Sequence, residues 1–555
     1  MTRSRITAAL VALSATAVLA AGCGDDEKES GGGSGTPTAE VKSGGTFTGY
    51  YTSFPDYMDP ALSYTQEGWT SLWTAYTPLL TYKHAEGADG AELVPGLAEA
   101  MPEISEDGLT YKLKLRQGLK YSDGSPVKAN DFEHTIKRVL NLESGGSSFY
   151  AGIEGADKYV EDGKASADIS GITADDATGD ITIKLAEKNG SFSFSLAMDF
   201  AGLVKGDTPF ENLTKTPPPG VGPFVVEDVE PGRGFSLVKN KNFTPLENTP
   251  EAKADRIDIT VQKNLRSQTQ DVIANKVDYL QDPPAADQIR TVKDTIPDRY
   301  KEYVTNSTYY YFLNVQEKPF DNEKARQAVN TAIDKRALAR IFGGLLEPSC
   351  NFLPPGMAGF EKIEPCPYGD PNAAPDLAKA KQLVQESGTA GEEITVFGND
   401  EEPSKPVAEY LADVLTQIGY KAKPRIIEGS VYFQTIGNQK TKAQAGFANW
   451  FQDYPAPSNF LFLVDGASIQ PTNNQNFGNV DDPEINELIK KANENTDIEA
   501  AAADYAAVDR KLVEKALVAP YGNRKLTKIT SERVSFDGLL FHPVYSADLT
   551  TLGLK

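Results

Sequence analysis

The chain has 555 residues, with 55 Lys and Arg against 78 Asp and Glu, so its formal net charge is −23. Hydrophobic residues make up 40% and charged residues 24%, as in an ordinary folded protein. The acid excess argues against a nucleic-acid-binding protein, which needs Lys and Arg to displace the counterions of the phosphate backbone. The three histidines, His84, His134 and His542, are far apart in sequence, so we expect no His-built metal centre.

The N-terminus is predicted to be an export signal over residues 1–22. Two Arg precede an apolar run at 8–21 that is too short to span a bilayer stably. The run ends in LAAGC, which resembles the lipobox of bacterial lipoproteins, although Ala stands where Leu is usual, three positions before the Cys. We therefore expect Cys23 to be acylated. An ordinary secretory signal with an incidental Cys is the alternative.

Residues 23–43 follow, rich in Asp, Glu, Ser, Gly and Thr, and we expect a lipid-anchored, disordered tether there. The two other cysteines, Cys350 and Cys366, bracket a stretch rich in Pro and Gly. In an exported protein such a pair is expected to form a disulfide, which stabilises a loop of this length by about 3 kcal/mol. Two unrelated buried thiols are the alternative.

The remaining sequence alternates strand and helix patterns. In chain order, we predict strands at 45–51 and 110–116, a helix at 128–142 with Asn130 as N-cap, a strand at 180–185, a hairpin of 224–229 and 234–239, a strand at 257–261, a helix at 325–342, a strand at 394–397, and helices at 406–418, 483–493 and 500–515. This alternation indicates an α/β fold.

Motifs of catalysis are missing from the sequence. It contains no G-x-S-x-G, no H-E-x-x-H, no C-x-x-C and no phosphate-binding Gly-rich motif. We therefore expect a binding protein without catalytic residues, cofactor or metal. Carboxylate pairs leave no fixed spacing, so a surface hydrolase stays open as an alternative.

Several segments together resemble the family 5 extracellular solute-binding proteins, the peptide- and nickel-type receptors of bacterial ABC importers. The resemblance lies in residues 95–99 (PGLAE) with 107–111 (DGLTY), 115–127 (LRQGLKYSDGSPV) with 129–132 (ANDF), 220–224 (GVGPF), 314 with 319–322 (PFDN) and 329–335 (VNTAIDK), and 450–455 (WFQDYP). These matches follow the family's order and cover most of the chain after residue 44. Within the family, the chain is most similar to oligopeptide- and dipeptide-binding proteins.

The resemblance implies a two-lobed periplasmic-binding-protein-like fold, type II, cluster C, with an extra inserted domain and a hinge. The implied parts are lobe I at 44–80, 196–307 and 525–555, an inserted domain at 81–195, and lobe II at 308–524. Chain crossings near 307 and 524 would form the hinge. A ligand would then bind in the cleft between the lobes.

The resemblance also implies ligand-binding residues. Asp453 stands where peptide-binding members hold the α-amino group, and a turn cap before Pro455 is its alternative role. The backbone of Asn449, Trp450 and Phe451 would hydrogen-bond an extended ligand as an added strand, although Trp450 is equally well explained as a core aromatic. The further candidates are Tyr64 and Gln66 from the first lobe and Lys405 for a ligand carboxylate, which is otherwise a solvated helix-start Lys. Phe447 replaces an Arg of some oligopeptide receptors, which puts a fixed carboxylate anchor in doubt.

The function implied is a monomeric, lipid-anchored receptor on the extracellular face of the cell membrane, or on its periplasmic side if a second membrane is present. It would capture peptides and deliver them to an ABC permease, and would bind no nucleic acid. Another solute, such as an oligosaccharide, an opine-like amino acid or a chelated metal, stays open. The sequence does not decide peptide length, side-chain preference or the partner permease.

Overall fold

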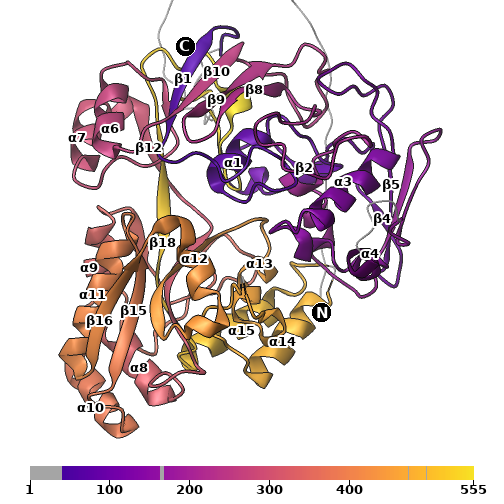
Figure 1. Ribbon diagram of the computed structural model, residues 1–555. Helices are drawn as coiled ribbons and strands as arrows, with labels where there is room; N and C mark the ends of the chain where they lie inside the picture. The colour runs from indigo at the N-terminus through magenta and orange to yellow at the C-terminus, as the bar shows by residue number, and fades with distance from the viewer. Residues whose placement is uncertain (1–40, 163–167, 473, 496) are drawn as a thin grey trace, which may run out of the picture. The chain divides into compact units, whose positions relative to one another are not determined.

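A computed structural model gives the fold of the chain (Figure 1) and describes residues 41–555 except 163–167, 473 and 496. The predicted signal, Cys23 and most of the predicted tether lie outside the described residues. The described chain begins just before the expected start of the body at residue 44. Its beginning is held in place because Lys42 exchanges two backbone hydrogen bonds, of 3.1 and 3.0 Å, with Leu554 near the C-terminus.

A five-stranded sheet defines what we call the first lobe. Its order is β11 (Tyr279–Leu280), β1 (Thr46–Tyr51), β10 (Arg256–Val261), β9 (Gly234–Lys239) and β8 (Phe224–Glu230). β1 is parallel to both of its neighbours, whereas β10, β9 and β8 are antiparallel. The hairpin of β8 and β9 is confirmed, and Gly232 takes the positive φ that its turn needs. Helices α1 (Gln66–Leu72), α6 (Leu265–Ile273) and α7 (Ile289–Thr295) accompany this sheet.

A smaller sheet lies in the part of the chain where an inserted domain was expected. Its order is β4 (Glu103–Ile104), β5 (Thr110–Lys114), β7 (Asp180–Lys184) and β6 (Ile172–Ala174). Side chains of β5 and β7 alternate between buried and open positions, as the sequence pattern predicted. The neighbouring elements are β2 (Leu80–Tyr82), α2 (Gly87–Gly90), β3 (Leu93–Pro95), α3 (Asn130–Asn141), α4 (Ala156–Asp162) and α5 (Phe192–Ser195).

A seven-stranded sheet defines the second lobe. Its order is β12 (Tyr300–Val304), β18 (Val518–Ile529), β13 (Ser307–Leu313), β17 (Ala445–Phe451), β15 (Glu393–Asn399) and β16 (Lys421–Ile427), with β14 (Leu346–Pro348) also paired to β18. Every residue of β13 is buried, as expected for a strand covered on both faces. The long strand β18 pairs with β13 through one half and with β12 through the other. Figure 1 shows it in yellow, running from one lobe into the other.

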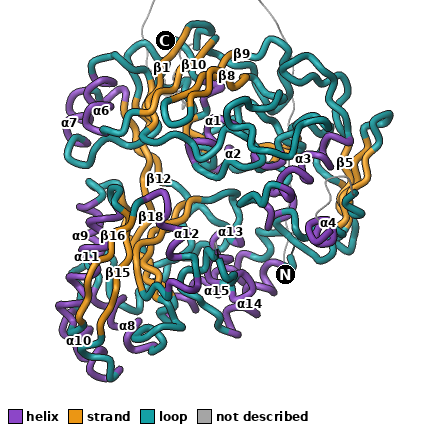
Figure 2. Tube along the Cα trace, in the orientation of Figure 1, coloured by secondary structure: helices purple, strands orange, loops and turns teal. Residues whose placement is uncertain are grey.

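Helices surround this second sheet, and Figure 2 shows them in purple beside the strands. They are α8 (Glu323–Ala332), α9 (Lys335–Ile341), α10 (Leu377–Ser387), α11 (Ser404–Ile418), α12 (Gly429–Ile436), α13 (Ser458–Leu461), α14 (Pro483–Asn493) and α15 (Ala502–Glu514); the short strands β19 (Phe541–His542) and β20 (Ser546–Ala547) form a hairpin near the C-terminus. The mixed α/β composition predicted from the sequence is therefore confirmed.

Two local predictions were wrong. The helix expected at 325–342 is two helices, because Ile333 is extended and the side chain of Asp334 accepts hydrogen bonds from the amides of Arg336 and Ala337, which starts α9. Asn130 is not the N-cap of α3, since that position is Ala129. The Asn130 amide instead donates a 2.9 Å hydrogen bond to the Asp176 side chain, which satisfies the helix start from outside.

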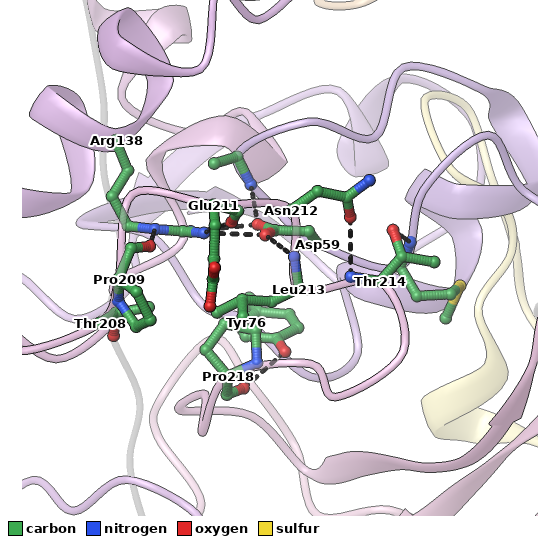
Figure 3. Close-up of polar contacts among 12 residues, drawn as sticks. Asp59, Tyr76, Arg138, Thr208, Pro209, Glu211, Asn212, Leu213, Thr214 and Pro218 are labelled. Atoms are coloured by element: carbon green, nitrogen blue, oxygen red, sulfur yellow. Dashed lines mark hydrogen bonds and ion pairs between the residues drawn. The ribbon is translucent and has the colours of Figure 1, made fainter.

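A buried ion pair joins α3 to the chain before α1 (Figure 3). The Arg138 guanidinium donates two hydrogen bonds, of 3.1 and 2.8 Å, to the two oxygens of Asp59, and both side chains are 0% exposed. Arg138 also donates to the carbonyls of Pro209 and Glu211, and Asp59 accepts from the Leu213 amide. Every buried polar atom of Arg138 and Asp59 therefore has a hydrogen-bond partner. Because Asp59 lies just before Tyr64 in the chain, the ion pair holds that segment in place.

In the second lobe, Cys350 and Cys366 are joined by a disulfide, with 6.0 Å between their Cα atoms.

Within 41–555, apart from the gaps given above, no three His, Cys, Asp or Glu side chains gather in a way that could hold a metal ion. In the same residues, no helix is both long enough and apolar enough to cross a membrane.

Candidate functional site

A cavity of about 310 Å³ lies where the two lobes face each other. This volume is at the lower end of the ~300–1,000 Å³ typical of small-molecule sites. One wall comes from the segment at 64–69, which begins α1 in the first lobe, together with Val544 from the turn of the C-terminal hairpin. The opposite wall comes from the second lobe, through residues 449–453 at the end of β17, Phe433 of α12, and the loop residues Gln475 and Phe477.

Six of the residues singled out from the sequence line this one cavity: Tyr64, Gln66, Asn449, Trp450, Phe451 and Asp453. Their proximity could not be read from spacing, because two come from before residue 70 and four from around residue 450. Lys405 lies elsewhere. It is an exposed residue in the first turn of α11 and does not line the cavity.

Tyr64 is held by the turn that precedes α1. The carboxylate of Asp56 accepts a hydrogen bond of 2.9 Å from the Tyr64 amide and one of 3.1 Å from the Thr65 hydroxyl. The Tyr64 ring stacks on Trp69, with 5.6 Å between centroids, and meets Phe200 edge-on at 5.2 Å. These contacts direct the Tyr64 hydroxyl across the cleft, where it donates a 2.9 Å hydrogen bond to Asp453.

Asp453 lies just beyond the end of β17 and is only 7% exposed. Its Oδ2 accepts hydrogen bonds from Tyr64 and, at 2.7 Å, from the Asn459 side chain, whose oxygen in turn accepts from the Asp453 amide at 2.8 Å. Burial raises the pKa of Asp453 to about 7, although these two hydrogen bonds oppose the rise. Both donors are neutral, so the described residues supply no positive charge to this carboxylate.

The carboxylate of Asp453 therefore has a different structural role from the turn cap considered above. Its hydrogen bonds reach side chains, Tyr64 and Asn459, and none in the described structure comes from a backbone amide of the turn. The second oxygen, Oδ1, receives no hydrogen bond from the described residues. An aspartate in this state can accept a cationic group from a ligand.

Strand β17, which ends just before Asp453, has one open edge. β17 pairs with β13 along its whole length, from Ala445 to Phe451, but its other neighbour, β15, pairs only with Ala445 and Gly446. Beyond Gly446, no described strand pairs with that edge, although the Tyr432 hydroxyl donates to the Phe447 carbonyl at 2.7 Å. Backbone groups at such an edge are available to an extended ligand.

Several polar side chains on the cavity walls already form hydrogen bonds within the protein. The Gln66 amide donates a 2.6 Å hydrogen bond to Ser546, and the Gln452 amide donates one of 2.8 Å to the Pro543 carbonyl. The Trp450 indole donates to Asn459 at 3.2 Å and its ring packs edge-on against Phe462, so Trp450 is both a wall residue and a packed one. Each of these contacts orients a side chain that the ligand would meet.

Seven further wall residues were not singled out from the sequence: Thr65, Trp69, Phe433, Gln452, Gln475, Phe477 and Val544. Trp69 had a usable signal, because it follows Gln66 by three residues and so shares one face of α1. Phe433, Phe477 and Val544 had none, since their segments reach the cavity only through tertiary packing. Among the described residues, the wall contains one carboxylate and no His, Cys or Lys, which suits binding and offers no nucleophile–base pair.

Comparison with known proteins shows which family and which solved structures this chain is similar to. The family model described as bacterial extracellular solute-binding proteins, family 5 Middle, matches residues 92–471. The chain is 26% identical over 454 residues to the periplasmic murein peptide-binding protein MppA of Escherichia coli K12, with 79% of this chain and 81% of the relative covered. It is 28% identical over 518 residues to heme-binding protein A of Haemophilus influenzae, with 88% of each covered.

Among solved structures, clavulanic acid biosynthesis oligopeptide binding protein 2 has a TM-score of 0.84 and 24% identity, covering 92% of this chain and 96% of that one. At this identity the likeness concerns the fold alone. The two-lobed α/β fold expected from the sequence is confirmed.

Proposed function

Because the chain belongs to the bacterial extracellular solute-binding proteins of family 5, a family of binding proteins and not of enzymes, we propose that it captures peptides by their amino end at Asp453. The observation that carries this proposal is the Asp453 carboxylate, buried in the cavity wall with only neutral donors beside it. A peptide ammonium supplies the missing positive charge. The names of MppA and of the oligopeptide-binding structure agree with a peptide as ligand, while that of heme-binding protein A marks the breadth of the family.

Burying an ionised carboxylate without a cation is costly, and this cost is what raises the pKa of Asp453 to about 7. An ammonium that enters the cavity restores the ionised form and gains a charge-assisted hydrogen bond. The free energy that burial costs in the empty protein is thus recovered when such a ligand binds.

The open edge of β17 provides the second element of recognition. An extended peptide at this edge would exchange main-chain hydrogen bonds with Asn449 to Phe451, and such bonds do not depend on side-chain identity. The ammonium at Asp453 would set the register of the peptide along the strand. Capture by the amino end and the backbone would leave the later residues of the peptide free to vary.

We also propose the domain bounds of the protein and its attachment to the cell membrane. We take lobe I as 44–80, 196–307 and 525–555, the inserted domain as 81–195 and lobe II as 308–524, with closure about the crossings near 307 and 524. Acylation of Cys23 would anchor the body at the outer face of the cell membrane, and an ABC permease would receive the peptide. Support for the anchor comes from the lipobox-like sequence alone.

Native mass spectrometry of the protein purified from its host tests the proposed ligand class. We expect a heterogeneous set of peptides to be released on denaturation. A single sugar, a heme or a chelated metal in their place would contradict peptide capture and identify the alternative directly. Acylation of Cys23 is tested separately, by loss of lipid label from the membrane fraction in Cys23→Ser.

A further inference from the structure

The described cavity walls carry negative charge and no positive charge. Among the wall residues the structure describes, Asp453 is the one charged side chain, and the remaining polar groups are neutral amides and hydroxyls such as those of Gln66 and Gln475. A free dipeptide carries both an ammonium and a carboxylate. The walls thus provide a charged partner for the first group and none for the second.

Two basic residues that could have served a ligand carboxylate, Lys405 and Arg524, do not line the cavity. Lys405 is exposed on α11 and does not line the cavity. The Arg524 guanidinium donates a 3.1 Å hydrogen bond to the Tyr309 hydroxyl and lies 5.9 Å from the Phe342 ring, and it too is outside the walls. Phe447 stands where some oligopeptide receptors carry an Arg. It is buried in the core of the second lobe, where its ring packs against Tyr309, and it offers a carboxylate no positive charge.

The surroundings of the first-lobe wall are acidic. Glu67 follows Gln66 directly, and burial together with the carboxylates of Asp282, Asp56 and Glu401 raises the pKa of Glu67. Like charges at an interface disfavour a partner of the same sign. Lys263 lies near Glu401 and Arg524 near Asp282, so carboxylates outnumber cations here and a ligand carboxylate gains no net attraction from this wall.

The cavity also holds an uncovered aromatic surface. Phe433 of α12 is 38% exposed, and it stacks on Phe477 with 5.8 Å between centroids and 26° between planes. Both rings line the same cavity as Asp453. When an apolar group of a ligand covers this exposed aromatic surface, the burial makes the free energy of binding more favourable.

We infer that the cavity selects a ligand by one ammonium and a neighbouring apolar side chain, and makes no use of a ligand carboxylate. This inference rests on the proposed capture of peptides and narrows it. Peptides whose carboxyl end is amidated, or is carried away from the cavity by further residues, bind as well as a free dipeptide does. The chemical class recognised is that of apolar amines and of amino-terminal peptide segments.

Calorimetry on the full chain with three matched probes tests the inference: phenylalanyl-leucine, its C-terminal amide and its N-acetyl form. We expect amidation to change the Kd by less than about threefold and N-acetylation to weaken binding by at least about tenfold. Weakening by about threefold or more on amidation would overturn the inference while leaving peptide capture intact. Absence of binding by all three would overturn both.

A variant of Phe433 tests the apolar half. In the unmodified protein, phenylalanyl-leucinamide should bind at least about tenfold more tightly than alanyl-leucinamide, and in Phe433→Ala this preference should fall to about threefold or less. A preference that is unchanged in Phe433→Ala would show that the apolar side chain is recognised elsewhere. Phe433 is partly exposed but stacks on the buried Phe477, so the unfolding midpoint of Phe433→Ala is measured as well, and we expect it to fall only slightly.

Discussion

The hydroxyl of Tyr64 donates a 2.9 Å hydrogen bond to the carboxylate of Asp453, although 389 residues separate the two in sequence. Tyr64 belongs to the first lobe and Asp453 to the second, so one hydrogen bond spans the cavity between them. Asp453 has a second donor, Asn459, from its own lobe. A ligand that reaches Asp453 therefore acts on a group that both lobes already share, which couples binding to the contact between them.

Asp453→Asn should weaken peptide binding by more than about tenfold, or about 1.4 kcal/mol, because the amide keeps the shape of the side chain but removes the negative charge that an ammonium requires. Isothermal calorimetry with phenylalanyl-leucinamide measures the effect. Asp413→Asn is the matched control, since Asp413 is an exposed residue on the same lobe and does not line the cavity. Equal affinities in the two variants would refute the role given to Asp453.

Peptide affinity should fall as the pH falls below 7. The pKa of Asp453 is raised to about 7, so acid protonates the carboxylate, while the ligand's amino group stays charged below about 7.7. Lowering the pH from about 7.5 to about 5.5 should weaken binding about 25-fold, as the ionised fraction of a group with this pKa declines. In Asp453→Asn this acid limb should disappear. Its persistence would assign the titration to another group.

Tyr64→Phe should move this pH profile upward. The hydrogen bond from Tyr64 favours the ionised form of Asp453 and so lowers its pKa; removing the bond raises the pKa further. The midpoint of the affinity profile should therefore lie at higher pH than in the unmodified protein, with the high-pH affinity reduced far less than in Asp453→Asn. A midpoint that stays in place would mean that the hydroxyl does not act on the carboxylate in solution.

Arg138→Met should destabilise the protein by about 3–5 kcal/mol, because it leaves the buried Asp59 carboxylate without its cation. Chemical denaturation measures the change in the free energy of unfolding. Arg233→Met provides the control, since the Arg233–Glu230 pair is exposed and such pairs contribute about 0–1 kcal/mol. A comparable loss in both variants would indicate that side-chain size, and not burial of the pair, sets the effect.

Removal of the disulfide should lower stability without changing ligand affinity. Cys350 and Cys366 are 16 residues apart, and closing a loop of about 15 residues stabilises a fold by about 3 kcal/mol. Neither cysteine lines the cavity. Cys350→Ala/Cys366→Ala should therefore unfold at lower denaturant concentration and bind peptide with the Kd of the unmodified protein. An altered Kd would show that the disulfide shapes the site.

Much of the local structure was determined by the sequence alone. Alternating apolar residues produced β5 and β7, Pro and Gly produced the β8–β9 turn, and Gly419 with positive φ ends α11 where predicted. These features depend on a few neighbouring residues, so a period or a cap suffices to find them. The break between α8 and α9 was not predicted, because the apolar pattern continues through it. The side chain of Asp334 caps a new helix there in spite of that pattern.

The candidate site was only half determined in this way. Family-like motifs pointed to Asp453 and Tyr64 separately, but their hydrogen bond, the burial that raises the pKa of Asp453, and the placing of Phe433 and Phe477 on the same cavity were decided by the tertiary structure. The physical reason is that burial and contact between distant segments are properties of how whole elements pack. No spacing along the chain records which side chains two lobes bring face to face, or that Lys405 stays outside.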